Sequence, residues 1–182
     1  MARNIRKSKV KRMRPIFFVF CEGETEVAYV NYLKSKYRLP VEIIPKKSDS
    51  NISCRYIENC KKSYFTTTSD KTFMMYDLDV DGILNTLSCI PEVTLLISNP
   101  CIELWFLLHS QDCKSELDSR KCIKKYEALS PDYKKGRLNV SDLHILEQGE
   151  DRAIERAKKM VTPENPSTTV YKLVEALRAE IH

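Results

Sequence analysis

The chain has 182 residues, of which 42% are hydrophobic, 9% aromatic and 30% charged. This length suits a single domain with a sizeable core, and the composition excludes a chain that is disordered throughout. No stretch is apolar for long enough to form a secretory signal core or a membrane span, so we expect a cytoplasmic protein with no membrane partner.

The cysteines fit that compartment. There are seven, an odd number, and none of them form a Cys-x-x-Cys pair. Without a secretory signal, this pattern predicts reduced thiols that are buried or incidental, and it disfavours both a disulfide framework and a zinc ribbon.

Positive charge is concentrated at the N-terminus. The formal net charge is +5, but residues 1–14 contain no acid and seven basic side chains. These are Arg3, Arg6, Lys7, Lys9, Lys11, Arg12 and Arg14. The other residues hold 23 basic against 25 acidic side chains and carry about −2. We predict a flexible basic arm over residues 1–14 that binds nucleic-acid phosphates by counterion release. A solvated tail without a partner is the alternative.

Strand and helix signals alternate along the first 110 residues. Short apolar runs predict strands over residues 16–21, 41–44, 71–76 and 92–97. Helical spacing predicts helices over residues 27–37 and 52–64, and a short helix before the fourth strand. Asn99 and Pro100 predict another helix start, with Asn99 as its cap. The alternation predicts an α/β fold with a mainly parallel four-stranded sheet flanked by helices.

Beyond residue 110 only helices are predicted. They cover residues 116–129, 141–160 and 168–181, and a polar segment, 130–136, separates the first two. We expect these C-terminal helices, from about residue 111, to pack on the sheet. Residues 15–182 would then form one domain with a helical extension.

Acidic residues directly follow two of the predicted strands. Glu22 follows the first, Asp77 closes the third, and Asp79 and Asp81 come at alternate positions after it. Carboxyl ends of parallel strands share one sheet edge, where ligands bind, so these carboxylates should lie together. Carboxylate oxygens suit Mg²⁺ or Mn²⁺, which can activate water and stabilise a leaving oxygen. An Asp-x-Asp taken alone is more often a solvated loop, an Asx turn or a helix cap than a catalytic site.

The same residues resemble a known pattern. Glu22 with the Gly23 turn, followed by a strand ending in Asp77-Leu78-Asp79, resembles the Toprim pattern. Three further stretches are similar to the RloB-like family of bacterial defence proteins. They are Ser98-Asn99-Pro100-Cys101-Ile102-Glu103-Leu104-Trp105, Tyr133-Lys134-Lys135 and Asn165-Pro166-Ser167-Thr168-Thr169-Val170.

The resemblance implies a Toprim-like fold and a Mg²⁺- or Mn²⁺-dependent nuclease that acts on RNA or DNA in anti-phage defence. Glu22 would act as general base or acid, and Asp77 and Asp79 would be catalytic metal ligands. Glu22 and Asp81 would complete the ligand set, with Gly23, Glu26 and Glu103 in supporting positions. The resemblance also suggests a separately encoded ATPase partner, because the chain has no Gly-x-x-x-x-Gly-Lys motif. The sequence leaves open whether the protein forms a homo-oligomer.

Several alternatives remain at this point. Glu103 could complete the metal site or simply stabilise a helix N-terminus. His109 is more typical of a structural residue, and Trp105 of the core. Asp79-Val80-Asp81-Gly82 also resembles a phosphatase loop, which keeps a small-molecule phosphohydrolase open. A non-catalytic module that binds nucleic acid or an ATPase is the other alternative.

Overall fold

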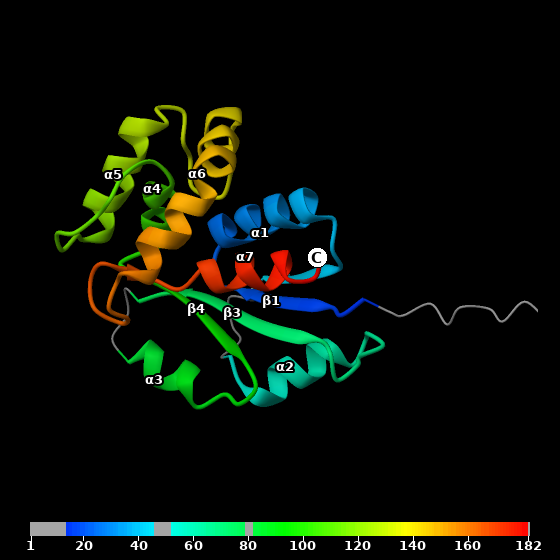
Figure 1. The fold of residues 1–182 in the computed structure, drawn as a ribbon. Coiled ribbons are helices and arrows are strands. Elements are labelled where there is room, and N and C mark those ends of the chain that lie inside the picture. The colour runs from blue at the N-terminus through cyan, green and yellow to red at the C-terminus, as the bar shows by residue number, and fades with distance from the viewer. Residues whose placement is uncertain (1–13, 46–51, 79–81, 182) are drawn as a thin grey trace, which may run out of the picture.

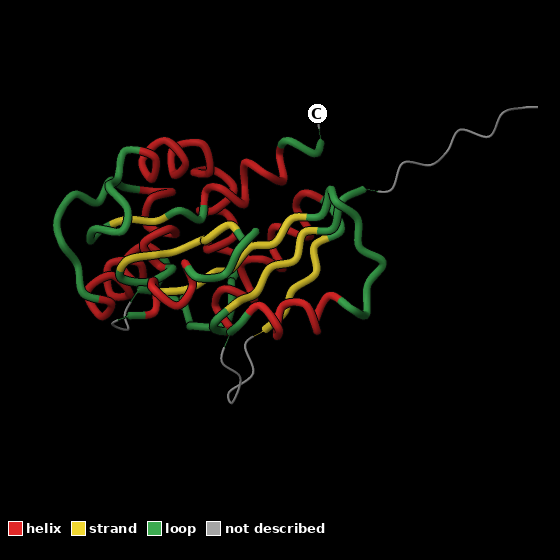
Figure 2. The backbone as a smooth tube through the Cα atoms, turned by 90° about the horizontal axis from the view of Figure 1, so that it is seen from below, coloured by secondary structure: helices red, strands yellow, loops and turns green. Residues whose placement is uncertain are grey.

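A computed structural model describes residues 14–45, 52–78 and 82–181. Its centre is a five-stranded sheet with the strand order β2-β1-β3-β4-β5 (Figure 2). The strands are β1 (Phe17–Cys21), β2 (Val41–Pro45), β3 (Lys71–Asp77), β4 (Thr94–Asn99) and β5 (Ser167–Thr168). The first four run parallel and β5 runs antiparallel to β4. The predicted α/β class and mainly parallel sheet are confirmed.

The side chains of strand β1 are apolar on both faces of the sheet, and each face is covered by helices. Phe17 and Val19 pack into the core beneath α1 (Glu24–Tyr37) and α7 (Tyr171–Arg178). Phe18 and Phe20 pack into a smaller core with α2 (Cys54–Lys61) and α3 (Ile83–Ser88). Figure 1 shows these helix pairs on opposite faces. A continuous apolar run is what a parallel strand covered on both sides requires.

The remaining helices form a layer beside the sheet. They are α4 (Glu103–Ser110), α5 (Ser119–Leu129) and α6 (Val140–Lys158) (Figure 1). Tyr126 of α5 packs against Phe106 of α4, with ring centroids 5.4 Å apart. The buried Tyr126 hydroxyl donates a hydrogen bond to Asp142, whose side chain also completes a capping box with Asn139 at the start of α6. These contacts fix the polar segment between α5 and α6.

Two local predictions were wrong. The predicted helix from residue 168 begins only at Tyr171, and Thr168 belongs instead to the fifth strand, which pairs with β4. Asn99 is not a helix cap: it ends β4 and its side-chain amide donates to the Pro163 carbonyl at 2.8 Å. Helix α4 begins at Glu103, with Ile102 at the cap position. Trp105 is fully buried in the core, as predicted.

Several other sequence predictions fall on residues outside the described ranges. Of the predicted basic arm, residues 1–13 lie outside the described residues, and Arg14 is exposed. Asp79 and Asp81 lie outside them as well. The division into an arm and one domain therefore stays a prediction. Among the helices of the described ranges, none combines the length and the apolar character that crossing a membrane requires.

Candidate active site

The carboxyl ends of β1 and β3 bring two of the predicted site residues together. The strands pair in parallel with Cys21 opposite Met75, so Glu22 and Asp77 follow at the same edge. The Asp77 backbone N–H donates to Glu22 Oε2 at 3.2 Å, and the Glu22 N–H donates to the Met75 carbonyl at 3.1 Å. Both side chains are half-buried. The Glu22 carboxylate is therefore held on the end of the neighbouring strand.

Glu26 belongs to the same group of acids. Gly23 is the cap of α1, and Glu26 in the first turn folds back over it: a Cβ at position 23 would lie 2.8 Å from Glu26 Oε2. Burial raises the pKa of Glu26, and the negative charges of Glu103 and Glu22 raise it further, against hydrogen bonds from backbone N–H groups. Gly23 thus makes room for a carboxylate whose ionisation the fold disfavours.

Glu103 lies at the start of α4 and is fully buried. The Tyr133 hydroxyl donates to Glu103 Oε1 at 2.7 Å, and Lys135 Nζ lies 3.9 Å from the same oxygen. Glu103 Oε2 has no hydrogen-bond partner among the described residues. Burying a carboxylate oxygen without a hydrogen-bond partner costs free energy of folding. The described residues do not offset this desolvation cost at Oε2.

The segment between α5 and α6 closes over the start of α1. The Gly136 N–H donates to Thr25 Oγ1 at 3.0 Å. Gly136 has a φ of +78°, and a Cβ there would lie 2.9 Å from Glu24 Oε2, so glycine is required for this approach. The anchored segment presents Lys135 to the acids. Periodicity gave no signal for Lys135 or Thr25, although the resemblance covered Tyr133-Lys134-Lys135.

These elements surround a cavity of about 310 Å³. Its lining residues are Glu22, Gly23, Glu24, Thr25, Glu26, Asp77, Ile102, Lys135 and Gly136. In the three described ranges, no set of three His, Cys, Asp or Glu side chains is arranged to hold a metal ion. The acids offer oxygen donors only, which is the ligand chemistry of Mg²⁺ and Mn²⁺.

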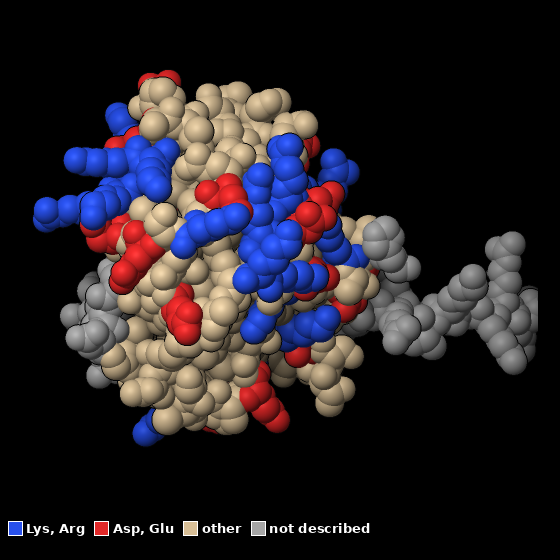
Figure 3. Space-filling view, turned by 60° about the vertical axis from the view of Figure 1, so that its left-hand side comes forward, with Lys and Arg blue, Asp and Glu red and all other residues tan. Residues whose placement is uncertain are grey.

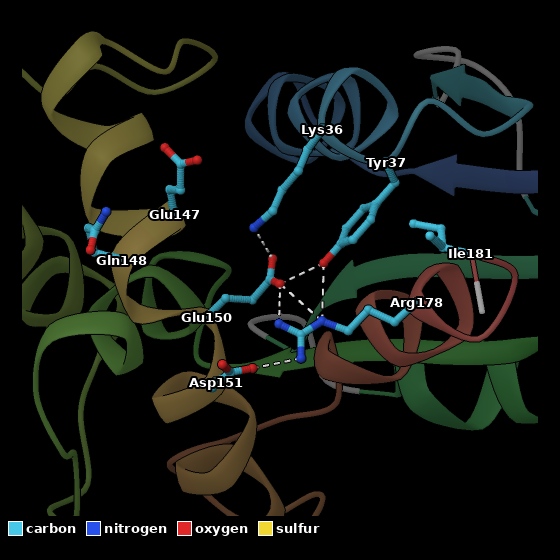
Figure 4. Close-up of a pocket in the computed structure, with 8 residues that line it drawn as sticks. All are labelled: Lys36, Tyr37, Glu147, Gln148, Glu150, Asp151, Arg178 and Ile181. Atoms are coloured by element: carbon cyan, nitrogen blue, oxygen red, sulfur yellow. Dashed lines mark hydrogen bonds and ion pairs between the residues drawn. The ribbon is translucent and has the colours of Figure 1, made fainter.

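A larger cavity, about 520 Å³, lies where α1, α6 and α7 meet (Figure 4). Lys36 Nζ lies 2.7 Å from Glu150 Oε2, Tyr37 donates to Oε1 at 2.6 Å, and Arg178 pairs with both Glu150 and Asp151. Burial would raise the pKa of Glu150, but these hydrogen bonds outweigh it and lower the pKa. Lys36 is ten residues from Glu26, about 15 Å along α1. We therefore assign this network to holding three helices together.

His109 and the cysteines contribute no nucleophile or base to the site. His109 is buried, its Nδ1 lies 2.8 Å from the Trp105 carbonyl, and burial lowers its pKa to about 4, so it is neutral and structural. All seven cysteines are free thiols. Burial raises the pKa of Cys21, the thiol next to Glu22, which removes the thiolate needed for reactivity.

Removing the Glu26 charge should stabilise the protein. With the pKa raised on folding, ionisation of Glu26 opposes the fold above that pKa, and this opposition disappears as the pH falls below the ordinary glutamate value. Glu26→Gln should therefore raise the melting temperature by a few degrees near neutral pH with EDTA present, since about 1 kcal/mol corresponds to 2–4 °C. The gain should shrink in acid. Calorimetry measures both, with the exposed Glu24→Gln as control; a lower melting temperature for Glu26→Gln would contradict the prediction.

Comparison of the sequence with models of protein families gave a match, and this match covers most of the fold. The model of the RloB-like protein family matches residues 17–177, from β1 into α7. Neither the comparison with curated proteins nor the comparison with solved structures gave a match. The matched range includes Glu22, Glu26, Asp77, Glu103 and Lys135, and it covers most of the chain. The chain therefore belongs to the RloB-like protein family.

Proposed function

We propose that this protein is a Mg²⁺- or Mn²⁺-dependent nuclease that hydrolyses phosphodiester bonds at the carboxylate edge of its sheet. The observation that carries the proposal is the meeting of Glu22 and Asp77 at the ends of adjacent parallel strands, around a cavity that also receives Lys135. Ligands of open α/β sheets bind at this edge. The Toprim resemblance assigns the same two acids to phosphodiester chemistry.

The cavity offers the oxygen donors that a hard divalent cation prefers, although no three acids of the described ranges are arranged to hold an ion. The donors are carboxylate oxygens, Glu103 Oε2 is buried without a partner among described residues, and the pKa of Glu26 is raised by burial and further by the charges of Glu103 and Glu22. A positive ion in the cavity would offset the repulsion among these charges, although Glu103 itself does not line the cavity. Asp77 and Glu22 would hold the ion, with Asp79 and Asp81 as further ligands from the sequence. When bound, it would polarise the phosphate and lower the pKa of a water molecule.

The side chains around the cavity would have three further roles: proton transfer, binding of the phosphate and positioning of Lys135. Glu22, fixed by the Asp77 N–H, would accept or return the proton of the attacking water. Lys135 lines the cavity on a segment anchored at Gly136 and would place positive charge beside the phosphate. Glu103, held by the Tyr133 hydroxyl, would position Lys135 through the carboxylate oxygen that both side chains approach.

The wider biological assignment rests on the family resemblance. We propose an effector of anti-phage defence that works with a separately encoded ATPase. Co-purification with an ATPase from the same defence locus, followed by ATP-dependent cleavage, is the corresponding test.

Cleavage of mixed substrates tests the proposed activity. The purified protein is incubated with tRNA, single-stranded RNA and plasmid DNA, with Mg²⁺, with Mn²⁺ and with EDTA. Cleavage of at least one polymer with either metal and none with EDTA is expected, because activation of water depends on the cation. Metal-dependent release of phosphate from small phosphoesters, without cleavage of any polymer, would favour the phosphohydrolase. Binding without cleavage in every condition would favour a non-catalytic module.

A further inference from the structure

Helix α5 has one strongly basic face. Arg120, Lys121, Lys124 and Lys125 all lie on the exposed side of this 11-residue helix, opposite the buried Cys122 and Tyr126. Lys121 pairs with Asp118 at 3.1 Å. No ion pair joins Arg120, Lys124 or Lys125 to any residue in the described ranges. Most of this charge is therefore available to a partner.

The segment that follows α5 carries further basic side chains and reaches the candidate site. Lys134, Lys135 and Arg137 are exposed, and Lys135 also lines the cavity with Glu22 and Asp77. Figure 3 is turned toward the side of the molecule on which Figure 1 places α5, and it shows Lys and Arg side chains at the upper left, with a second gathering at the centre. Tyr133 packs on Tyr126 with ring centroids 4.8 Å apart, so the segment and α5 are held in one arrangement.

The chemistry of this face favours a polyanion over a folded protein. Its exposed side chains are mostly Lys and Arg, with no aromatic side chain among them, whereas the centre of a protein interface is enriched in aromatic residues and poor in lysine. A helix of 11 residues is about 16 Å long, enough to follow a few successive phosphates. Basic side chains that neutralise phosphates gain affinity by releasing counterions.

We propose that the basic face of α5 and residues 134–137 binds the backbone of the nucleic-acid substrate and leads it past Lys135 into the acidic cavity. This inference rests on the proposed nuclease function, because it assigns the substrate path of that site. Arg120, Lys124 and Lys125 provide affinity that does not depend on base sequence. They take no part in the chemical step.

Salt-dependent binding tests the path. The triple variant Arg120→Gln, Lys124→Gln, Lys125→Gln is compared with a control triple, Lys34→Gln, Arg55→Gln, Lys62→Gln. The control removes the same charge from exposed positions on α1, on α2 and directly after α2. Both keep residues 1–14. Fluorescence anisotropy with labelled single-stranded RNA and duplex DNA is measured in EDTA between about 50 and 200 mM salt.

We expect the α5 variant to bind nucleic acid at least about tenfold more weakly than the wild type. The slope of log binding constant against log salt concentration should become shallower by about 2–3, because each of the three lost phosphate contacts contributes about 0.7–0.9 to it. The control triple should match the wild type. Equal salt slopes for the α5 variant and the wild type would overturn the inference. So would displacement of RNA from wild type by polyglutamate at the same charge concentration, which would indicate an acidic protein partner.

Cleavage measurements separate this inference from the proposed function. Metal-dependent cleavage by the wild type with unchanged binding by the α5 variant would leave the nuclease standing and remove the α5 path. Weakened binding by the α5 variant, with no cleavage by the wild type under any metal, would establish a nucleic-acid surface on a protein that does not cleave nucleic acid by itself. Melting temperatures of both triples check that each is folded.

Discussion

Glu22→Gln should remain inactive at high manganese, whereas Asp77→Asn should recover measurable cleavage. Glutamine keeps the size of Glu22 and an oxygen that can accept the Asp77 N–H, but it cannot accept the proton of the attacking water. Loss of such a general base typically slows a reaction by about 10²–10⁴-fold. Asp77→Asn removes one charge from a metal ligand, and mass action at high Mn²⁺ can offset weaker binding.

Single-turnover cleavage across a manganese titration measures both variants, and calorimetric titration gives their Mn²⁺ affinities. The exposed Glu155→Gln on α6 is the matched control: it removes one carboxylate that does not line the cavity, and it should behave as the wild type. Equal rescue of Glu22→Gln and Asp77→Asn would make Glu22 another ligand. Full activity in both would leave a non-catalytic module as the better explanation.

Gly149→Ala should destabilise the protein severely, although alanine is the better helix former by about 1 kcal/mol. Gly149 lies in α6 where this helix crosses α4, and a Cβ there would lie 2.2 Å from the His109 carbonyl oxygen and 2.6 Å from the His109 Cβ. Backbone atoms cannot turn away, so the two helices must separate. Overpacking of this kind costs about 1–3 kcal/mol and occasionally more.

For a chain of this size, that cost corresponds to a fall of roughly 2–12 °C in melting temperature. Differential scanning calorimetry measures it. Gln148→Ala, at the exposed neighbouring position, is the matched control and should change the melting temperature little. The same melting temperature for Gly149→Ala and the wild type would show that α4 and α6 can shift apart freely.

The apolar runs of the sequence determined the α/β class and the edge at which the predicted site lies. The run Phe17–Cys21 contains no polar residue, which only a strand covered on both faces can accommodate, and the β–α alternation requires parallel pairing. Because parallel strands end at one edge, the positions of Glu22 and Asp77 could be predicted to meet, and they do. The nature of the bound ion and the reaction are proposals that rest on these positions.

Tertiary structure alone decided the features that depend on distant partners. β5 is a strand of two residues that exists through its pairing with β4, so it has no periodicity to read. Asn99 has the local signal of a helix cap, but strand pairing and the Pro163 carbonyl hold it in β4. Lys135 and Glu103 are 32 residues apart and meet because Gly136 docks on Thr25 at the start of α1. Such contacts are favourable only after the core has formed, because the chain must first lose the entropy of closing the loops between them.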